Sequence, residues 1–126
     1  MIIVDTSVLV TSLAGPKRNH PSLTRMLERG ELMCLPTVVL YEWWRGPRTP
    51  EELAIQEVLF PVEFAIDFGP KEAEIAARIY RQASRARARE MDIAIAACAI
   101  AREAPLWTMN SVDFAGIPDL TLASIH

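Results

Sequence analysis

The sequence of 126 residues has little of what several large classes of protein require. It holds two cysteines, Cys34 and Cys98, both in apolar runs without a C-x-x-C spacing, so we expect buried, reduced thiols and no disulfide framework. The longest apolar run, residues 93–101, is far shorter than the roughly 20 residues that cross a bilayer. No signal peptide precedes the first apolar run. These features predict a soluble, cytoplasmic protein.

Positive charge and histidine are also scarce. The net charge of −3 argues against a strongly basic module that coats nucleic acid, but it does not exclude a nuclease with a local acidic site. His20 is expected in a loop and His126 at the C-terminus, so no serine or cysteine has a recognisable histidine partner for nucleophilic triad chemistry. Lys17 and Lys71 do not follow plausible strands, which disfavours a phosphate-accepting receiver domain.

What the sequence does contain is an alternation of short apolar strands and helices. Apolar residues make up 51% and charged residues 23%, as in an ordinary globular domain, and the length predicts a single domain over residues 1–126. Strands are predicted at residues 2–4, 31–35, 62–66, 106–108 and, weakly, 120–122. The alternation predicts an α/β fold with a central, mostly parallel sheet of about five strands and helices on both faces.

Capping and turn residues predict where the helices begin. Thr6 and Ser7 follow Asp5 as capping residues ahead of an apolar run, and a proline suited to the first helical position stands at residue 21. Helices are therefore expected after Asp5, over residues 21–30, from residue 36 through Glu42, over residues 51–59, from residue 69 towards 89, and from Asp92 to residue 102.

Acidic residues stand where the chain leaves the predicted strands or begins a helix. Asp5 directly follows the first strand, and Asp113 follows the fourth. Because ligands of open parallel sheets bind beyond the carboxyl ends of the strands, these loops are expected to converge. Asp5, Asp92 and Asp113 each also have a structural interpretation as a helix cap. Glu42 lies between bulky apolar residues, which suggests a partner such as arginine or a metal ion.

Taken together, Asp5, Glu42, Asp92 and Asp113 predict a catalytic metal site. Two carboxylates about 4 Å apart repel by roughly 4 kcal/mol at an effective dielectric constant of about 20, so a crevice that holds several needs a cation or raised pKa values. Oxygen ligands without cysteine or histidine favour Mg²⁺ or Mn²⁺. Such ions suit hydrolysis of a phosphodiester, in which one activates water and another stabilises the departing oxygen.

Two stretches of sequence resemble those of the PIN-domain family. The opening M-I-I-V-D-T-S-V (residues 1–8) resembles the start of these proteins, and M-D-I-A-I-A-A (91–97) followed by L-W-T-M-N-S-V-D-F (106–114) resembles their closing motif. Size and alternation are similar to the VapC-type ribonuclease toxins of type II toxin–antitoxin systems. The resemblance implies an endoribonuclease that uses Mg²⁺ or Mn²⁺, cleaves single-stranded regions of RNA, forms a homodimer and is silenced by a cognate antitoxin.

The resemblance also assigns roles to residues around the acids. Thr6 and Asn110 become polar supports that orient carboxylates or metal-bound water. Arg85, Arg87 and Arg89 precede the closing motif, where they either guide RNA phosphates or form a solvated helix end.

Two further groups of residues have both a functional and a structural interpretation. Lys17 and Arg18 either border the RNA path or belong to a solvated loop. Tyr41, Trp43 and Trp44 suit a dimer or antitoxin surface, although core packing explains at least one of them. Two alternative functions remain: a housekeeping PIN nuclease in RNA processing, and a non-catalytic PIN-like interaction module, which would be expected to lack one of the acids.

Overall fold

The apolar run at the start of the chain forms the central strand of the sheet. The computed structural model describes residues 1–16, 18 and 21–125, and in it β1 (Ile2–Val4) lies between β2 (Met33–Cys34) and β3 (Leu106–Trp107), all parallel. Ile3 pairs with Cys34 on one side and with Leu106 on the other. Burial of a side chain such as Ile3 contributes about 2 kcal/mol, so this strand anchors the core.

The expectation of about five strands was wrong, because two predicted strands are reduced to isolated bridges. Residues 62–64 form a 3₁₀ turn, η1 (Val62–Phe64), and in this segment Ile66 alone bridges to Pro36. The Val62 N–H donates to the Glu57 carboxylate. The N–H groups of Phe64 and Ala65 donate to carbonyls three residues earlier, so these groups are not available to a neighbouring strand. At the other edge, Leu122 bridges to Leu106. The sheet of the described residues therefore has three strands.

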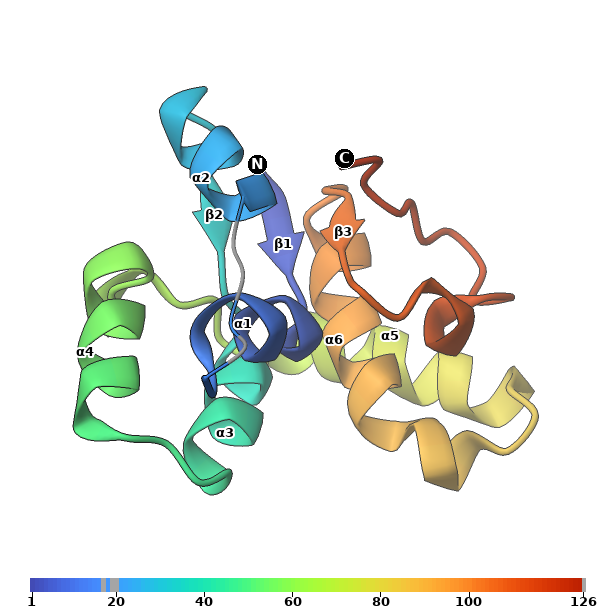
Figure 1. Ribbon diagram of the computed structural model, residues 1–126. Helices are drawn as coiled ribbons and strands as arrows, with labels where there is room; N and C mark the ends of the chain where they lie inside the picture. Colours follow the sequence, from blue (N-terminus) through green and yellow to red (C-terminus); the bar gives the residue numbers. More distant parts are fainter. Residues whose placement is uncertain (17, 19–20, 126) are drawn as a thin grey trace.

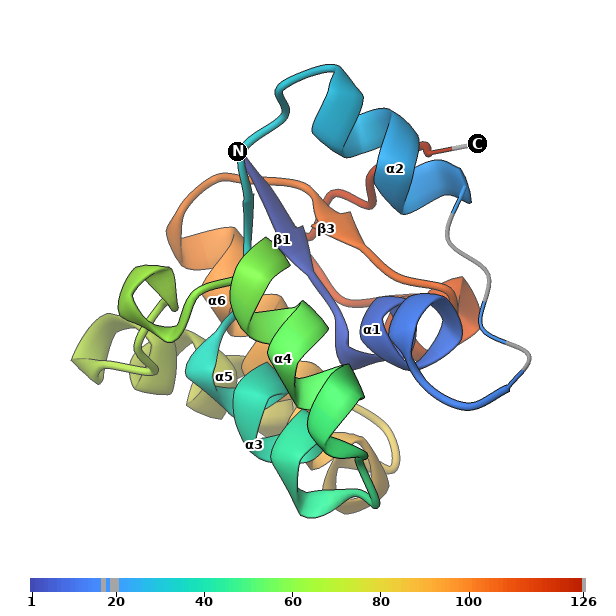
Figure 2. The same cartoon turned by 60° about the vertical axis from the view of Figure 1, so that its left-hand side comes forward.

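Helices cover both faces of the sheet, as the sequence predicted. In Figures 1 and 2 the strands lie between α1 and α2 on one side and α5 and α6 on the other, with α3 and α4 below the carboxyl ends of β1 and β2. The helices are α1 (Thr6–Leu13), α2 (Pro21–Glu28), α3 (Thr37–Arg45), α4 (Pro50–Leu59), α5 (Pro70–Gln82) and α6 (Glu90–Ala101), with short 3₁₀ turns η2 (Ala86–Arg89) and η3 (Ser111–Phe114). No helix among the described residues is long and apolar enough to cross a membrane.

Glutamates in the first turns of α4 and α5 tie these helices to distant parts of the chain. Glu52 accepts the Thr49 N–H at 2.8 Å, which closes the first turn of α4, and also accepts the N–H of Gly15 at 2.7 Å. Glu72 accepts the N–H of Gly69 at 3.0 Å and pairs with Arg102 at 3.1 Å. Each glutamate thus stabilises both a helix start and a tertiary contact.

One predicted boundary near the acids differs from the structure. The sequence placed the start of the last helix at Asp92, whereas α6 begins at Glu90. The η2 turn runs directly into α6, so the helical backbone already exists when the chain reaches Asp92. Asp92 therefore lies in the first turn of α6 and is not its cap. Cys34 and Cys98 are free thiols, half-buried and buried respectively.

Candidate active site

Asp5 is buried at the junction of β1 and α1. Its backbone occupies the N-cap position of α1, but its side chain makes no capping hydrogen bond. The carboxylate instead accepts hydroxyl hydrogens from Ser7 at 2.7 Å and Thr108 at 2.8 Å, both on Oδ2. Among the described residues Oδ1 accepts no hydrogen bond. Burial with one oxygen held by hydroxyls gives Asp5 a fixed orientation and leaves a second oxygen for a ligand.

Glu42 comes to the same region from the middle of α3. The hydroxyl of Thr6, the first residue of α1, donates to Oε1 of Glu42 at 2.7 Å. Arg45 lies on the other side, with Nη2 at 3.4 Å from Oε2, and the Glu42 side chain is 18% exposed. Glu42 therefore has an arginine partner, one of the two that its apolar sequence context suggested, and a hydroxyl partner besides.

Asp92 has the most perturbed pKa of the acids in this region. Burial raises the pKa of this carboxyl first, and the negative charges of Asp5, Asp113 and Glu42 raise it further, to about 6. The positive charge of Arg89 acts in the opposite direction. Asp5, Asp113 and Glu42 therefore lie near enough to Asp92 for their charges to act on it.

Asp113 lies at the rim of this region. It belongs to η3, which follows β3 and packs against α6. Its side chain is exposed, unlike that of Asp5. Asn110, the other predicted support, is also exposed, and its backbone N–H donates to the Thr108 hydroxyl at 3.0 Å.

The predicted RNA-binding residues have different environments. Arg85 and Arg87 are exposed, whereas the Arg89 guanidinium donates to the backbone carbonyls of Asp113 and Ala115, both at 3.2 Å. In the earlier loop, Lys17 lies outside the described residues. Arg18 pairs with Glu51 at 3.3 Å, so part of its charge is neutralised.

The aromatic residues of α3 are also divided between core and surface. Trp43 is fully buried, with Arg48 stacked 4.0 Å from its ring centroid, which assigns it to the core. Tyr41 and Trp44 are 57% and 49% exposed.

Ser7 and Thr108 are site residues that the sequence alone did not identify. Their hydroxyls are 3.2 Å apart, and the Met109 N–H donates to Ser7 at 2.9 Å, so the pair joins the turn after β1 to the turn after β3. The available signal was position, because each hydroxyl lies within three residues of the end of its strand. Hydroxyl residues are common at helix starts and turns, which gave them an ordinary local explanation.

The donor set fits a hard divalent cation. Carboxylates and hydroxyls supply oxygen ligands throughout, and Asp92 shows that their negative charge is not fully compensated. In the described parts of the chain, however, no three Asp, Glu, His or Cys side chains converge in the arrangement of a metal site. The acids are thus close enough to repel one another but do not point at a single centre.

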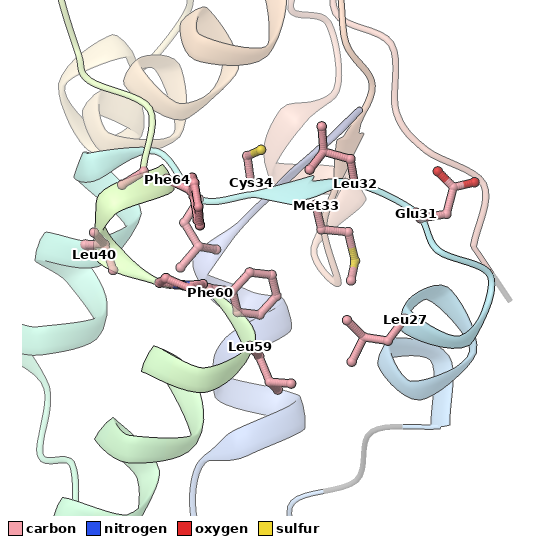
Figure 3. Close-up of a pocket in the computed structure, with 12 residues that line it drawn as sticks. Leu27, Glu31, Leu32, Met33, Cys34, Leu40, Leu59, Phe60 and Phe64 are labelled. Carbon is pink, nitrogen blue, oxygen red and sulfur yellow. The ribbon is translucent and has the colours of Figure 1, made fainter.

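An apolar pocket lies on another side of the molecule, between α2, β2 and the end of α4. It has a volume of about 380 Å³, and Figure 3 shows Leu27, Met33, Leu59 and Phe60 pointing into it. Around it, Leu27, Leu32 and Phe64 are 40%, 62% and 67% exposed. Exposed apolar side chains gathered at a cavity are typical of protein–protein contacts.

Fold and site together define a parallel α/β protein with an acidic cluster at the carboxyl ends of its strands. The sequence model of the PIN domain matches residues 2–119, and the chain belongs to the PIN domain family. A search of curated protein sequences returned no significant match.

Solved structures with this fold cover nearly the whole chain. A chain of VapBC2 from Rickettsia felis, bound to a DNA fragment from the promoter, is 22% identical, with a TM-score of 0.76 and 100% of both chains covered. A chain of DNA-bound VapBC from Salmonella typhimurium is 20% identical, with a TM-score of 0.74, covering 97% of this chain and 96% of that one. For FitAcB from Neisseria gonorrhoeae the identity is 19% and the TM-score 0.70, with 98% and 97% covered.

Proposed function

We propose that this protein is a metal-dependent endoribonuclease that hydrolyses phosphodiester bonds in single-stranded regions of RNA, and that it is the toxin of a VapBC-type toxin–antitoxin pair. The observation that supports the chemistry best is the position of Asp92, whose pKa is raised first by burial and then by the charges of three neighbouring carboxylates. Membership of the PIN domain family supports nuclease activity.

Asp5, Glu42, Asp92 and Asp113 would hold Mg²⁺ or Mn²⁺. When bound, such an ion supplies a Lewis acid and lowers the pKa of water. The chain's own residues orient the ligands: Ser7 and Thr108 fix the carboxylate of Asp5, and the Thr6 hydroxyl fixes Glu42. Asn110 stands at the exposed rim, where it can support a ligand or substrate.

The RNA would approach from the side of η2. Arg85 and Arg87 are exposed immediately before α6, so their charges are free to attract phosphate groups towards Asp92. Such contacts recognise the backbone of the RNA and contribute little to sequence preference.

The apolar pocket of Figure 3 is our proposed contact for the antitoxin. The solved VapBC complexes, which share the fold, support a partner protein for this chain. An antitoxin segment with apolar side chains would cover the exposed Leu32 and Phe64. Phe64→Asp is expected to weaken antitoxin binding in a pull-down assay and to leave RNA cleavage intact, whereas unchanged binding would exclude this pocket.

A second copy of the chain is proposed to pack on the face shared by α5 and α6. A pocket of about 530 Å³ lies there, lined by Phe68, Tyr80 and Met91, with Arg81 and Glu90 also present. Arg81 and Glu90 carry opposite charges beside one apolar pocket. In a two-fold symmetric dimer, Arg81 of each copy can therefore face Glu90 of the other. Tyr80→Asp is expected to shift the mass measured by light scattering from dimer to monomer.

The test of catalysis compares Asp92→Asn with Asp119→Asn. Purified protein is incubated with single-stranded RNA and Mn²⁺ or Mg²⁺, with and without EDTA. We expect cleavage by the wild type and by Asp119→Asn, and none by Asp92→Asn or with EDTA. Asp119 is exposed and serves as the matched control, and asparagine tolerates its backbone φ of 68°. If neither ion supported cleavage, or if Asp92→Asn cleaved as the wild type does, the nuclease proposal would be wrong.

The toxin role has a separate test. Expression of the wild type is expected to arrest growth, and co-expression of the small protein encoded beside it is expected to restore growth. Growth arrest that depends on Asp92 but is not relieved by any neighbouring gene product would instead favour a nuclease without an antitoxin.

A further inference from the structure

The side chain of Arg89 joins the beginning of α6 to the turn that carries Asp113. Its Nη2 atom donates to the carbonyl oxygens of Asp113 and Ala115, both at 3.2 Å, across 24 and 26 residues of sequence. Arg89 is three residues before Asp92. We propose that Arg89 is a positioning residue, which holds η3, and with it the Asp113 carboxylate, beside Asp92. The geometric part of this inference is independent of the proposed function, and its effect on metal binding depends on that function.

The turn needs such a contact because its own bonds are few. In η3 the Asp113 N–H donates to Asn110 at 3.0 Å, and the Ala115 N–H donates to Val112 at 3.2 Å. Isolated 3₁₀ turns of this length are weak. The following residue, Gly116, has a φ of 78°, so the chain bends away directly after the turn.

Two anchors connect η3 to the rest of the protein. The Phe114 side chain is buried, with 2% exposed, which fixes the turn on the core. A single apolar anchor still allows the turn to rotate about it, and Asp113, the exposed neighbour of Phe114, would move with any such rotation. Arg89 binds the carbonyls on both sides of Phe114, so it restricts that rotation.

An arginine suits this role better than a lysine. The guanidinium is planar and permanently charged, and its Nη2 carries two hydrogens held in that plane, so this one nitrogen can donate to both carbonyls with little loss of side-chain entropy. Arg89 is half-buried, in contrast to the exposed Arg85 and Arg87 of the same segment. This difference separates Arg89 from the two arginines that we assign to RNA.

The first experiment measures hydrogen exchange of backbone amides. Arg89→Met keeps an unbranched stem and removes the donors, and Arg87→Met is the matched control. We expect exchange at Asp113 and Ala115 to accelerate by about 10-fold in Arg89→Met, with no change in Arg87→Met or in the β1 amides, because local opening controls these rates. Arg89→Lys, which keeps the charge, is expected to accelerate the same amides less, and it replaces Arg89→Met if that variant does not fold. Unchanged exchange at both amides would overturn the proposal.

The second experiment connects the turn to metal binding by calorimetry with Mn²⁺. Residues that orient metal ligands typically change affinity by about 10-fold or more, so Arg89→Met is expected to weaken Mn²⁺ binding by roughly 10-fold. If Arg89 acts through Asp113, the same change in an Asp113→Asn background should cost less than about 2-fold. Equal losses in both backgrounds would overturn the positioning role. A wild type that binds no Mn²⁺ and cleaves no RNA would refute the proposed function, and the exchange data would still decide the role of Arg89.

Discussion

Two groups of buried or half-buried acids in this molecule have opposite electrostatics. The backbone N–H of Thr49 and then that of Gly15 lower the pKa of Glu52 in α4. For Glu72 in α5, burial raises the pKa, but hydrogen bonds from backbone N–H groups and from Arg102 outweigh it, and the net shift is downward. Asp92 is different, because burial and three neighbouring carboxylates raise its pKa to about 6.

The difference separates acids that the fold accounts for, which we call structural, from an acid that we propose to be functional. Glu52 and Glu72 are each surrounded by donors that compensate the charge, so the fold itself accounts for them. Asp92 lies among charges of its own sign, which the fold alone does not require. Uncompensated charge of this kind is typical of functional sites.

The largest expected effect is loss of activity when a functional acid is neutralised. Asp5→Asn keeps the size of the side chain and can still accept the hydroxyls of Ser7 and Thr108, but it removes a negative charge from the site. We expect RNA cleavage to fall by more than about 100-fold, beyond the loss typical of residues that only orient ligands. Initial rates of RNA cleavage in Mn²⁺ measure the effect, and urea unfolding checks that the variant is folded. A cleavage rate within a few-fold of the wild type would mean that Asp5 is not one of the functional acids.

Neutralising a structural acid should have the opposite consequence. Glu72→Ala leaves Arg102 without its partner and opens the first turn of α5, so the free energy of unfolding should fall by about 2–3 kcal/mol. Where the variant is folded, cleavage per folded molecule should match the wild type. Urea denaturation at 25 °C measures the stability; a strong loss of activity in the folded variant would contradict the division into two groups.

The pH dependence of stability should differ in sign between the groups. The raised pKa of Asp92 means that its contribution is fully present below the ordinary aspartate pKa and is lost as the pH rises through about 6. Without divalent ions, the unfolding free energy of the wild type relative to Asp92→Asn should therefore fall between pH 4 and 7. After allowance for solvent screening, we expect about 1–2 kcal/mol.

For the structural acids Glu52 and Glu72, stability should change with pH in the opposite direction. The pKa of Glu72 is lowered, so its stabilising contribution is present above the ordinary glutamate pKa and is lost as the pH falls. Urea titrations at a series of pH values test the direction in which stability changes with pH for both Asp92 and Glu72. A difference between wild type and Asp92→Asn that is constant from pH 4 to 7 would show that Asp92 has an ordinary pKa.

The smallest effect concerns Asp5, which shares features with both groups. Thr108→Val removes one of the two hydroxyls that fix Asp5 and keeps the shape of the side chain. We expect a loss of about 1 kcal/mol in stability and a several-fold weaker affinity for Mn²⁺. Calorimetry and urea unfolding measure the two effects. No change in Mn²⁺ affinity would mean that Thr108 serves the fold alone.

The sequence predicted the class of fold but overcounted the strands. Residues 2–4, 33–34 and 106–107 were identifiable because buried parallel strands are short apolar runs. Residues 62–66 are also mostly apolar, yet Glu57 and the turn after Pro61 compete for their backbone groups. These hydrogen bonds join residues no more than five positions apart, and strand propensity takes no account of them, so it could not exclude a strand there.

For the site, the sequence predicted the acids, the support of Thr6 and an arginine beside Glu42, but not the hydroxyls that hold Asp5. Asp5, Glu42 and Asp92 stood out because each follows a strand, lies in an apolar context or begins a helix, and the structure brings their charges together. The hydroxyl of Thr108 and the backbone contacts of Arg89 depend on how the end of β3 meets α1 and α6. Such contacts between distant segments have no signature in a single sequence.

The order of the sheet, β2-β1-β3, has a consequence for the growing chain on the ribosome. β1 is synthesised first, but one of its two neighbours, β3, and one of the two hydroxyls that bind Asp5 follow about a hundred residues later, since Thr108 is 103 residues from Asp5. Asp113 comes later still. A nascent chain therefore carries Asp5 without its second hydroxyl partner and without the last acid, and the enzyme that we propose cannot attack the message being translated until that segment has emerged.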